Sequence, residues 1–274
     1  MGIQDSLVIL VAAVYAVSAV GYAANFQRKG EIRGRIGLWS LILGWGIHST
    51  LLLRMVLTTG QVPLNSQVLP SLCAWLVVIV YLYLEISTPD RSLGALIAPI
   101  VTLLHLLTTS NLLGVDDVPT VAHTASWFRI HVLAYILAYA AFAISCVSST
   151  MYVMLIGEIQ KKHLGFFYDR LPPLETLDKF NNRAATFGFS FLSGGIVASS
   201  IWAYQEMYQM WVWSKPEFAP LLLTWVIYAA NLAARWGGWR GKRAAVLSIV
   251  GFAVIIFAFP VVGVLFSGRH PLTP

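Results

Sequence analysis

Eight apolar runs, each close to the length that crosses a lipid bilayer, dominate this sequence and restrict what the chain can fold into. A transmembrane helix needs about 20 consecutive, mostly apolar residues. Only 11% of the 274 residues are charged and 58% are hydrophobic, whereas about a quarter of a typical soluble domain is charged. We therefore predict an all-α, polytopic membrane protein with about eight transmembrane helices in one bundle, forming a single domain over residues 1–274. The expected helices lie near residues 5–26, 36–58, 67–87, 92–113, 129–156, 184–205, 219–236 and 244–266.

Basic residues predict the orientation of these helices. Thirteen of the 18 Lys and Arg residues fall in three clusters, which follow the first, fifth and seventh runs. The positive-inside rule assigns such clusters to cytoplasmic loops, and strict alternation of eight spans brings all three to the same side. Both termini are therefore expected on the outer, periplasmic side. The net charge of +6 is interpreted as a topology signal, and no nucleic-acid partner is expected.

Residues 157–183 form the one sizeable loop on the expected inner side. The Leu-Pro-Pro-Leu stretch at 171–174 interrupts the chain, and a helix is expected to begin near Glu175 and to continue into the sixth span. The loop is interpreted as a solvated connector, and docking of a cytoplasmic partner is the alternative.

Several kinds of chemistry are excluded or weakened. The chain has no GxSxG, HExxH, Walker or GxGxxG motif. Cys73 and Cys146 both lie in apolar runs and form neither a CxxC nor a CxxCH motif. Glu85 lies at the end of a span, and acidic residues are nearly absent from the spans. Because ion-coupled carriers generally need ionisable groups at mid-membrane depth, that class is the least favoured.

The outward segment 202–218 is unusually rich in aromatic residues. It contains Trp202, Trp211 and Trp213, together with two tyrosines and two methionines. Tryptophan and tyrosine favour the membrane–water interface, so an interfacial belt is one interpretation. A flat apolar surface that supports a planar hydrophobic ligand is the other.

Two histidines are expected at the same level as this segment. His131 stands at the outer start of the fifth span, and His270 follows the eighth. Two imidazoles at one depth suit bis-axial ligation of haem iron. Three basic residues, Arg129, Lys215 and Arg269, lie where they can pair with haem propionates. The alternative for each histidine is a hydrogen-bonding role at the surface.

His48 and His105 fall near the middle of their spans, 12 to 13 residues from the start. An imidazole in hydrocarbon needs a partner, because an unsatisfied polar group there is costly. A hydrogen bond between helices is one solution. A mid-membrane pair of haem ligands is the alternative hypothesis. His123 and His163 fall in loops and are expected to be solvated.

Several short stretches occur in an order that resembles a known family. They are Gly60–Asn65, Leu93–Pro99, His131 with Tyr139–Phe142, Leu174–Asp178, Trp202–Glu217 and Trp239–Arg243. On these stretches, over roughly residues 35–271, the chain resembles the cytochrome c assembly family of membrane haem-handling proteins, with its CcsA-type and HemX-type members. It departs from the family's tryptophan-rich WWD signature, since Met207 and Tyr208 replace a Trp and a Gly and the signature Asp is lost. Ala233 stands where the family has a histidine near the inner end of a span.

The resemblance implies a membrane protein that binds haem b without a covalent bond and presents it at the outer face for cytochrome c maturation. It implies His131 and His270 as the ligands of the haem iron. The implied partners are apocytochrome c and a membrane partner subunit, and the implied location is the bacterial inner membrane. Such a chain would be non-enzymatic by itself, although it could be a subunit of a cytochrome c haem lyase. A HemX-like regulatory or structural subunit and a haem-based transmembrane electron carrier remain open as alternatives.

Overall fold

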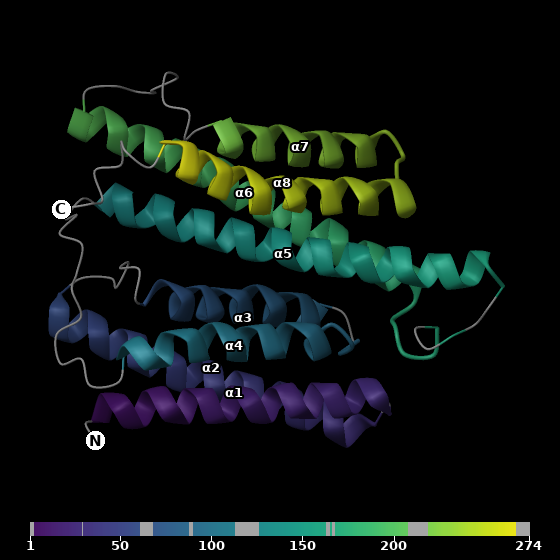
Figure 1. Cartoon of the computed structure of the whole chain (residues 1–274), viewed down its shortest axis with the longest axis horizontal. Coiled ribbons are helices and arrows are strands. Elements are labelled where there is room, and N and C mark those ends of the chain that lie inside the picture. Colours follow the sequence, from purple (N-terminus) through teal and green to yellow (C-terminus); the bar gives the residue numbers. More distant parts are fainter. Residues whose placement is uncertain are drawn as a thin grey trace. The chain divides into compact units, whose positions relative to one another are not determined.

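The computed structural model describes residues 3–28, 30–60, 68–87, 90–112, 126–162, 165, 168–207 and 219–266, and these residues form eight α-helices (Figure 1). The helices are α1 (Ile3–Gln27), α2 (Glu31–Thr59), α3 (Leu69–Ser87), α4 (Gly94–Leu112), α5 (Ser126–Gln160), α6 (Leu174–Met207), α7 (Ala219–Trp236) and α8 (Lys242–Phe266). The prediction of an all-α protein with eight helices is confirmed. The helices α5 and α6 are longer than their apolar spans, because each continues into polar residues.

The helix that was expected to begin near Glu175 is also confirmed. α6 begins at Leu174, directly after Pro172 and Pro173, and runs without a break to Met207. The link between α5 and α6 is therefore shorter than the 157–183 loop expected from hydropathy. Polar residues lengthen both helices here because a helix that leaves the bilayer can still satisfy its own backbone.

Four helices are long and apolar enough to cross a membrane, counted over the described parts of the chain. The helical segments that contain such an apolar stretch are Gln4–Gln27, Glu31–Thr58, Ser126–Gln160 and Leu174–Gln205, and the apolar helical segments of α3 and α4 are shorter. The all-helical architecture and these spans are those of a polytopic membrane bundle. The outward position of both termini stays a prediction.

The chain divides into two compact units, Met1–Arg129 with Lys162–Pro172 and Ile130–Lys161 with Pro173–Pro274. The first unit holds α1 to α4 and the second holds nearly all of α5, with α6, α7 and α8. The expectation of a single domain stays a prediction.

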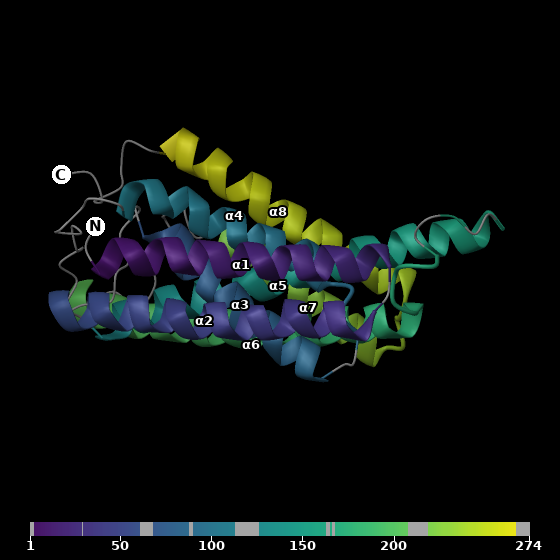
Figure 2. The same ribbon diagram turned by 90° about the horizontal axis from the view of Figure 1, so that it is seen from below.

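In the first unit, α1 and α2 lie side by side (Figure 2). Their backbones approach closely at two glycines, since a Cβ atom added to Gly21 would lie 2.8 Å from the Gly37 nitrogen. Small residues allow such close packing between membrane helices. Gly60 caps the C-terminal end of α2, with a left-handed φ of 70° that glycine adopts without strain and an N–H that donates to the Val56 carbonyl.

One end of this unit holds a buried carboxylate. The Glu85 side chain of α3 is only 4% exposed and lies 3.2 Å from Nε of Arg91. The Tyr22 hydroxyl of α1 donates a second hydrogen bond to it, with a length of 2.6 Å. A buried charge is tolerated only when it is paired, and Arg91 and Tyr22 supply the partners of Glu85. The cluster thereby joins α1, α3 and the turn that precedes α4.

In the second unit, aromatic rings form the centre of the core. Phe142 of α5 stacks on Tyr228 of α7 with ring centroids 3.6 Å apart, and both rings are fully buried. Gly188 of α6 lies against this pair, because an added Cβ would be 2.6 Å from the Phe142 ring. The small residue therefore makes room for the stacked rings among α5, α6 and α7.

Candidate functional site

The first candidate site lies in the second unit, where α5 begins and α6 ends. His131 stands in the second turn of α5 and is 9% exposed. Its ring centroid lies 5.6 Å from that of Trp202, which is five residues before the end of α6. Tyr135, one turn further along α5, meets the imidazole edge-on at the same centroid distance of 5.6 Å. The structure thus brings together two of the predicted site residues, His131 and Trp202.

Further rings continue this arrangement along one face of α5. Tyr135 is followed by Tyr139 and then by Phe142, with 6.5 Å between successive ring centroids. The Tyr135 hydroxyl lies 2.9 Å from the Ser199 hydroxyl of α6, which holds the phenol ring against that helix. Gly195 permits the contact, since a Cβ there would lie 2.6 Å from the Tyr135 ring. The position of the His131 ring is therefore supported by the packed rings of Tyr135, Tyr139 and Phe142.

The other predicted members of this site lie outside the described residues. They are His270, Trp211, Trp213, Lys215 and Arg269. Arg129 precedes His131 by two residues on α5. Ligation by His131 and His270 and propionate pairing by the three basic residues stay predictions.

The described part of the site fits haem chemically. Haem needs an imidazole for its iron and flat apolar surfaces for its ring, and His131 with Trp202 supplies one of each. No group of three or more His, Cys, Asp or Glu residues that could hold a metal ion by itself occurs among the residues with defined positions. Haem differs from a bare ion because its own ring supplies four nitrogen ligands, so that one or two side chains suffice.

The second candidate site lies in the first unit and contains both mid-span histidines. His48 of α2 and His105 of α4 are fully buried, with ring centroids 4.8 Å apart. The Ser71 hydroxyl of α3 lies between them, 2.8 Å from Nε2 of His48 and 3.0 Å from Nδ1 of His105. The sequence predicted a similar depth for His48 and His105, and the structure shows that their rings also lie next to each other.

Two further groups complete this chain of hydrogen bonds. The Tyr15 hydroxyl of α1 lies 3.2 Å from Nδ1 of His48, and Nε2 of His105 lies 3.1 Å from the Val8 carbonyl oxygen. Sequence reasoning missed Ser71 and Tyr15, because nothing in one sequence shows which polar group of another helix faces a histidine. All four helices of the first unit contribute a residue to this series of hydrogen bonds.

The hydrogen bonds of this second cluster bear directly on whether it can hold haem. Each ring nitrogen of His48 and His105 lies within hydrogen-bond distance of a protein group. Ligation of iron would require one nitrogen of each ring to give up its partner. The geometry supports the interpretation as hydrogen bonding between helices, and haem ligation by this pair stays a prediction.

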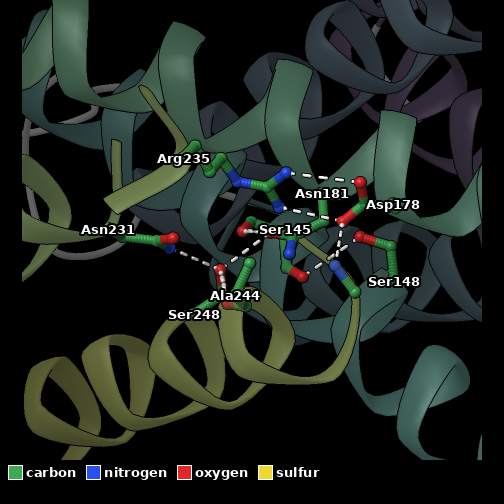
Figure 3. A network of polar contacts seen from close by, with 9 residues as sticks. Ser145, Ser148, Asp178, Asn181, Asn231, Arg235, Ala244 and Ser248 are labelled. Carbon is green, nitrogen blue, oxygen red and sulfur yellow. Dashed lines mark hydrogen bonds and ion pairs between the residues drawn. The ribbon is translucent and has the colours of Figure 1, made fainter. Parts of the chain in front are cut away.

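A third polar cluster lies in the second unit, near the turn between α7 and α8 (Figure 3). Arg235 of α7 donates to both carboxylate oxygens of Asp178 on α6, at 3.2 and 3.4 Å. The Gly241 backbone N–H donates to the same carboxylate at 3.3 Å. Asp178 thereby fixes both the end of α7 and the start of α8 against α6.

Amides and hydroxyls continue this cluster toward the core. The Asn181 side-chain oxygen accepts from Ser145 of α5 at 2.7 Å and from Ser248 of α8 at 2.8 Å. Asn231 of α7 donates to the Ser248 hydroxyl at 2.7 Å. Four helices are joined by this cluster, which sequence reasoning also missed.

Comparison with known proteins identifies the family. The model described as "Cytochrome C assembly protein" matches residues 65–270 of this chain. The cytochrome c biogenesis protein CcsA of Guillardia theta is 31% identical over 258 residues, which cover 86% of this chain and 84% of that protein. The protein of the same name from Chlamydomonas reinhardtii is 30% identical, over 82% of this chain and 66% of its own length. The one from Chlorella vulgaris is 30% identical, over 80% of each chain.

The chain belongs to the cytochrome c assembly family. The resemblance seen in the short stretches is thereby confirmed, including its extent over most of the chain. Family membership and the apolar helices together show a multi-pass membrane protein. Its assignment to a bacterial inner membrane stays a prediction.

Proposed function

We propose that this chain is a cytochrome c biogenesis protein that holds haem b without a covalent bond at its outer face and presents it for attachment to apocytochrome c. The observation that carries the proposal is the packing of the buried His131 ring against the Trp202 ring, with 5.6 Å between the two ring centroids. The family match supports the biological context. The proposal places the site in the inner membrane of a bacterium and includes a membrane partner subunit.

In this proposal the residues of the chain have three roles. His131 and His270 would hold the haem iron through their imidazoles, which is the usual role of histidine toward haem. Trp202, Trp211 and Trp213 form the flat apolar surface that excludes water from the ring. Arg129, Lys215 and Arg269 pair with the propionates through charge-assisted hydrogen bonds. Haem itself supplies the groups to which the cysteines of an apocytochrome CxxCH motif become attached.

The test is an absorption spectrum and a pyridine haemochrome assay on the purified full-length protein. We expect stoichiometric haem b in the wild type and its loss in the variant His131→Ala, His270→Ala. His163→Ala is the matched control, because that loop histidine is expected to be solvated, and its haem content should equal that of the wild type. Unchanged haem in the double variant would refute the assignment of the ligands.

A second candidate function is a HemX-like regulatory or structural subunit that transfers no haem. The departures from the family signature favour it, since Met207, Tyr208 and Ala233 replace residues that the family uses. Absence of haem from the wild-type protein would support this function. Maturation of cytochrome c that survives replacement of Trp211 and Trp213 by leucine would support it too.

A further inference from the structure

A hollow of about 420 Å³ lies between the first turns of α6 and the end of α7, entirely within the second unit. This volume is in the range of small-molecule sites. Most of the side chains that line it are polar or aromatic, and they include Asp178, Lys179, Asn182, Arg235, Trp236 and Arg240. The haem proposal uses none of these residues.

The acidic side chains of the hollow already have cationic partners. The Asp178 carboxylate is paired with Arg235, as described above. Glu175 forms an ion pair of 2.7 Å with Lys179. Arg240 adds a third positive charge to the lining, whose acidic residues are Glu175 and Asp178. An anion that arrives here therefore meets a net positive charge.

Unused hydrogen-bond donors accompany this charge. The Arg235 side chain is only 8% exposed, and within the described part of the chain its buried Nε has no hydrogen-bond partner. A buried N–H without a partner carries a desolvation cost that a ligand can relieve. An ammonium also has three donors, of which Lys179 uses one or two on Glu175. Guanidinium and ammonium groups together are typical of sites that bind phosphate.

The hollow lies at the level expected for lipid headgroups. Glu175 and Thr186, which mark its extent along α6, are 11 residues apart, or about 16 Å along a helix. The span predicted from hydropathy begins at residue 184, so most of this stretch lies beyond the apolar layer. Leu232 and Thr186 line the end nearest to the span. A headgroup at the polar end and an acyl chain at this end would both find suitable surroundings.

Exposed tryptophans mark the same level. Trp236 lines the hollow and is 91% exposed, and Trp239 in the following turn is 44% exposed. The guanidinium of Arg243 lies 5.6 Å from the centroid of the Trp239 ring. Tryptophan favours the membrane–water interface, and neighbouring basic residues attract acidic lipids. A lipid therefore explains these observations better than a soluble anion does.

We propose that this hollow binds the phosphate group of an acidic phospholipid, with Lys179, Arg235 and Arg240 as the cationic contacts. The bound lipid would hold the turn between α7 and α8 against α6. The site is independent of haem, and the proposal goes beyond the function given above.

Native mass spectrometry of the delipidated full-length protein in a non-ionic detergent tests this site. Phosphatidylglycerol and phosphatidylcholine are titrated separately. We expect the first phosphatidylglycerol to bind more tightly than the first phosphatidylcholine. In the variant Lys179→Gln, Arg240→Gln this affinity should fall by at least about fivefold, which is the effect of one basic residue on an acidic lipid.

The matched control is Lys161→Gln, Lys242→Gln, which removes the same charge from exposed positions of the second unit that do not line the hollow. It should keep the affinity of the wild type, and both variants should unfold at the wild-type temperature. Equal losses in the two variants would show that only the overall charge matters and would overturn the proposal. Inorganic phosphate that displaces phosphatidylglycerol at an equal concentration would show a free anion as the occupant and would overturn the lipid assignment.

Discussion

Arg235 and Asp178 face each other across α7 and α6 with two hydrogen bonds, although 57 residues separate them in the sequence. The pair does more than neutralise charge, because the same carboxylate also accepts from Gly241. Gly238 and Gly241 of this turn have φ values of 88° and 67°, which glycine adopts without strain. The end of α7, the turn and the start of α8 thus depend on one aspartate.

Asp178→Ala is therefore expected to destabilise the protein. It leaves the buried Arg235 guanidinium without its counter-ion, and breaking a buried pair from one side is strongly unfavourable. Because the Asp178 side chain retains 22% exposure, we expect a loss of about 2 kcal/mol rather than the full effect of a buried pair. Thermal unfolding in detergent measures the change. Glu175→Ala is the control, since its exposed pair with Lys179 should have no measurable effect.

Ser71→Ala is expected to loosen the first unit. The substitution removes the hydroxyl that lies between the two buried imidazoles and leaves His48 and His105 each with one partner fewer. Side-chain hydrogen bonds between membrane helices contribute about 1 kcal/mol each, so a loss of about 1–2 kcal/mol is expected. Ser190→Ala is the control, because this exposed hydroxyl donates to the Thr186 carbonyl of its own helix. Equal thermal stability of the two variants would show that the hydrogen bonds of Ser71 to His48 and His105 do not stabilise the first unit.

Replacement of both mid-span histidines separates the two interpretations of this cluster. If the pair only joins helices, His48→Ala, His105→Ala lowers the unfolding temperature and leaves the haem content per protein unchanged. Pyridine haemochrome assays on the folded fraction measure that content. Loss of haem from a variant that still carries His131 and His270 would instead support the mid-membrane haem site.

Gly195→Ala is expected to disturb the candidate haem site from a distance. The added methyl group would lie 2.6 Å from the Tyr135 ring, so the ring must move, and His131 packs against that ring. Overpacking of this kind costs about 1–3 kcal/mol. We expect a shifted haem absorption band or a reduced haem content. Gly194→Ala is a close control, because an added Cβ there meets no atom of the described residues within 4 Å.

Trp202→Leu should weaken haem binding, whereas Trp202→Phe should preserve part of it. Both substitutions remove the indole that lies 5.6 Å from His131, but phenylalanine keeps a flat ring at this position. Aromatic contacts contribute about 0.5–1.5 kcal/mol beyond the burial of area, so the haem affinities of the Leu and Phe variants are expected to differ by about twofold to twelvefold. Haem titration followed by absorbance measures it. Equal affinities would show that the ring is not part of the binding surface.

The sequence by itself determined the class of protein, the eight helices and most of their ends. Hydropathy is a local property, and a run of about 20 apolar residues forms a helix in a bilayer whatever its neighbours are. The sequence also placed His48 and His105 at a similar depth, because depth follows from counting along a helix. The short motifs were sufficient to indicate the family, since they occur in a fixed order over most of the chain.

Tertiary structure alone decided which groups meet. The rotation of α3 about its axis brings Ser71 between the two histidines, and the packing of α7 on α6 brings Arg235 to Asp178. Hydropathy cannot show either contact, because the mean hydropathy of a helix does not depend on its rotation about its own axis. The apolar spans expected for α5 and α6 are shorter than the helices themselves for a related reason, since helical hydrogen bonds do not stop where the apolar residues do. The start of α6 near Glu175 was nevertheless predicted, because Pro172 and Pro173 mark it in the sequence. The local sequence therefore determines where helices form in this protein, whereas the rotation and packing of the helices determine which polar side chains become hydrogen-bond partners.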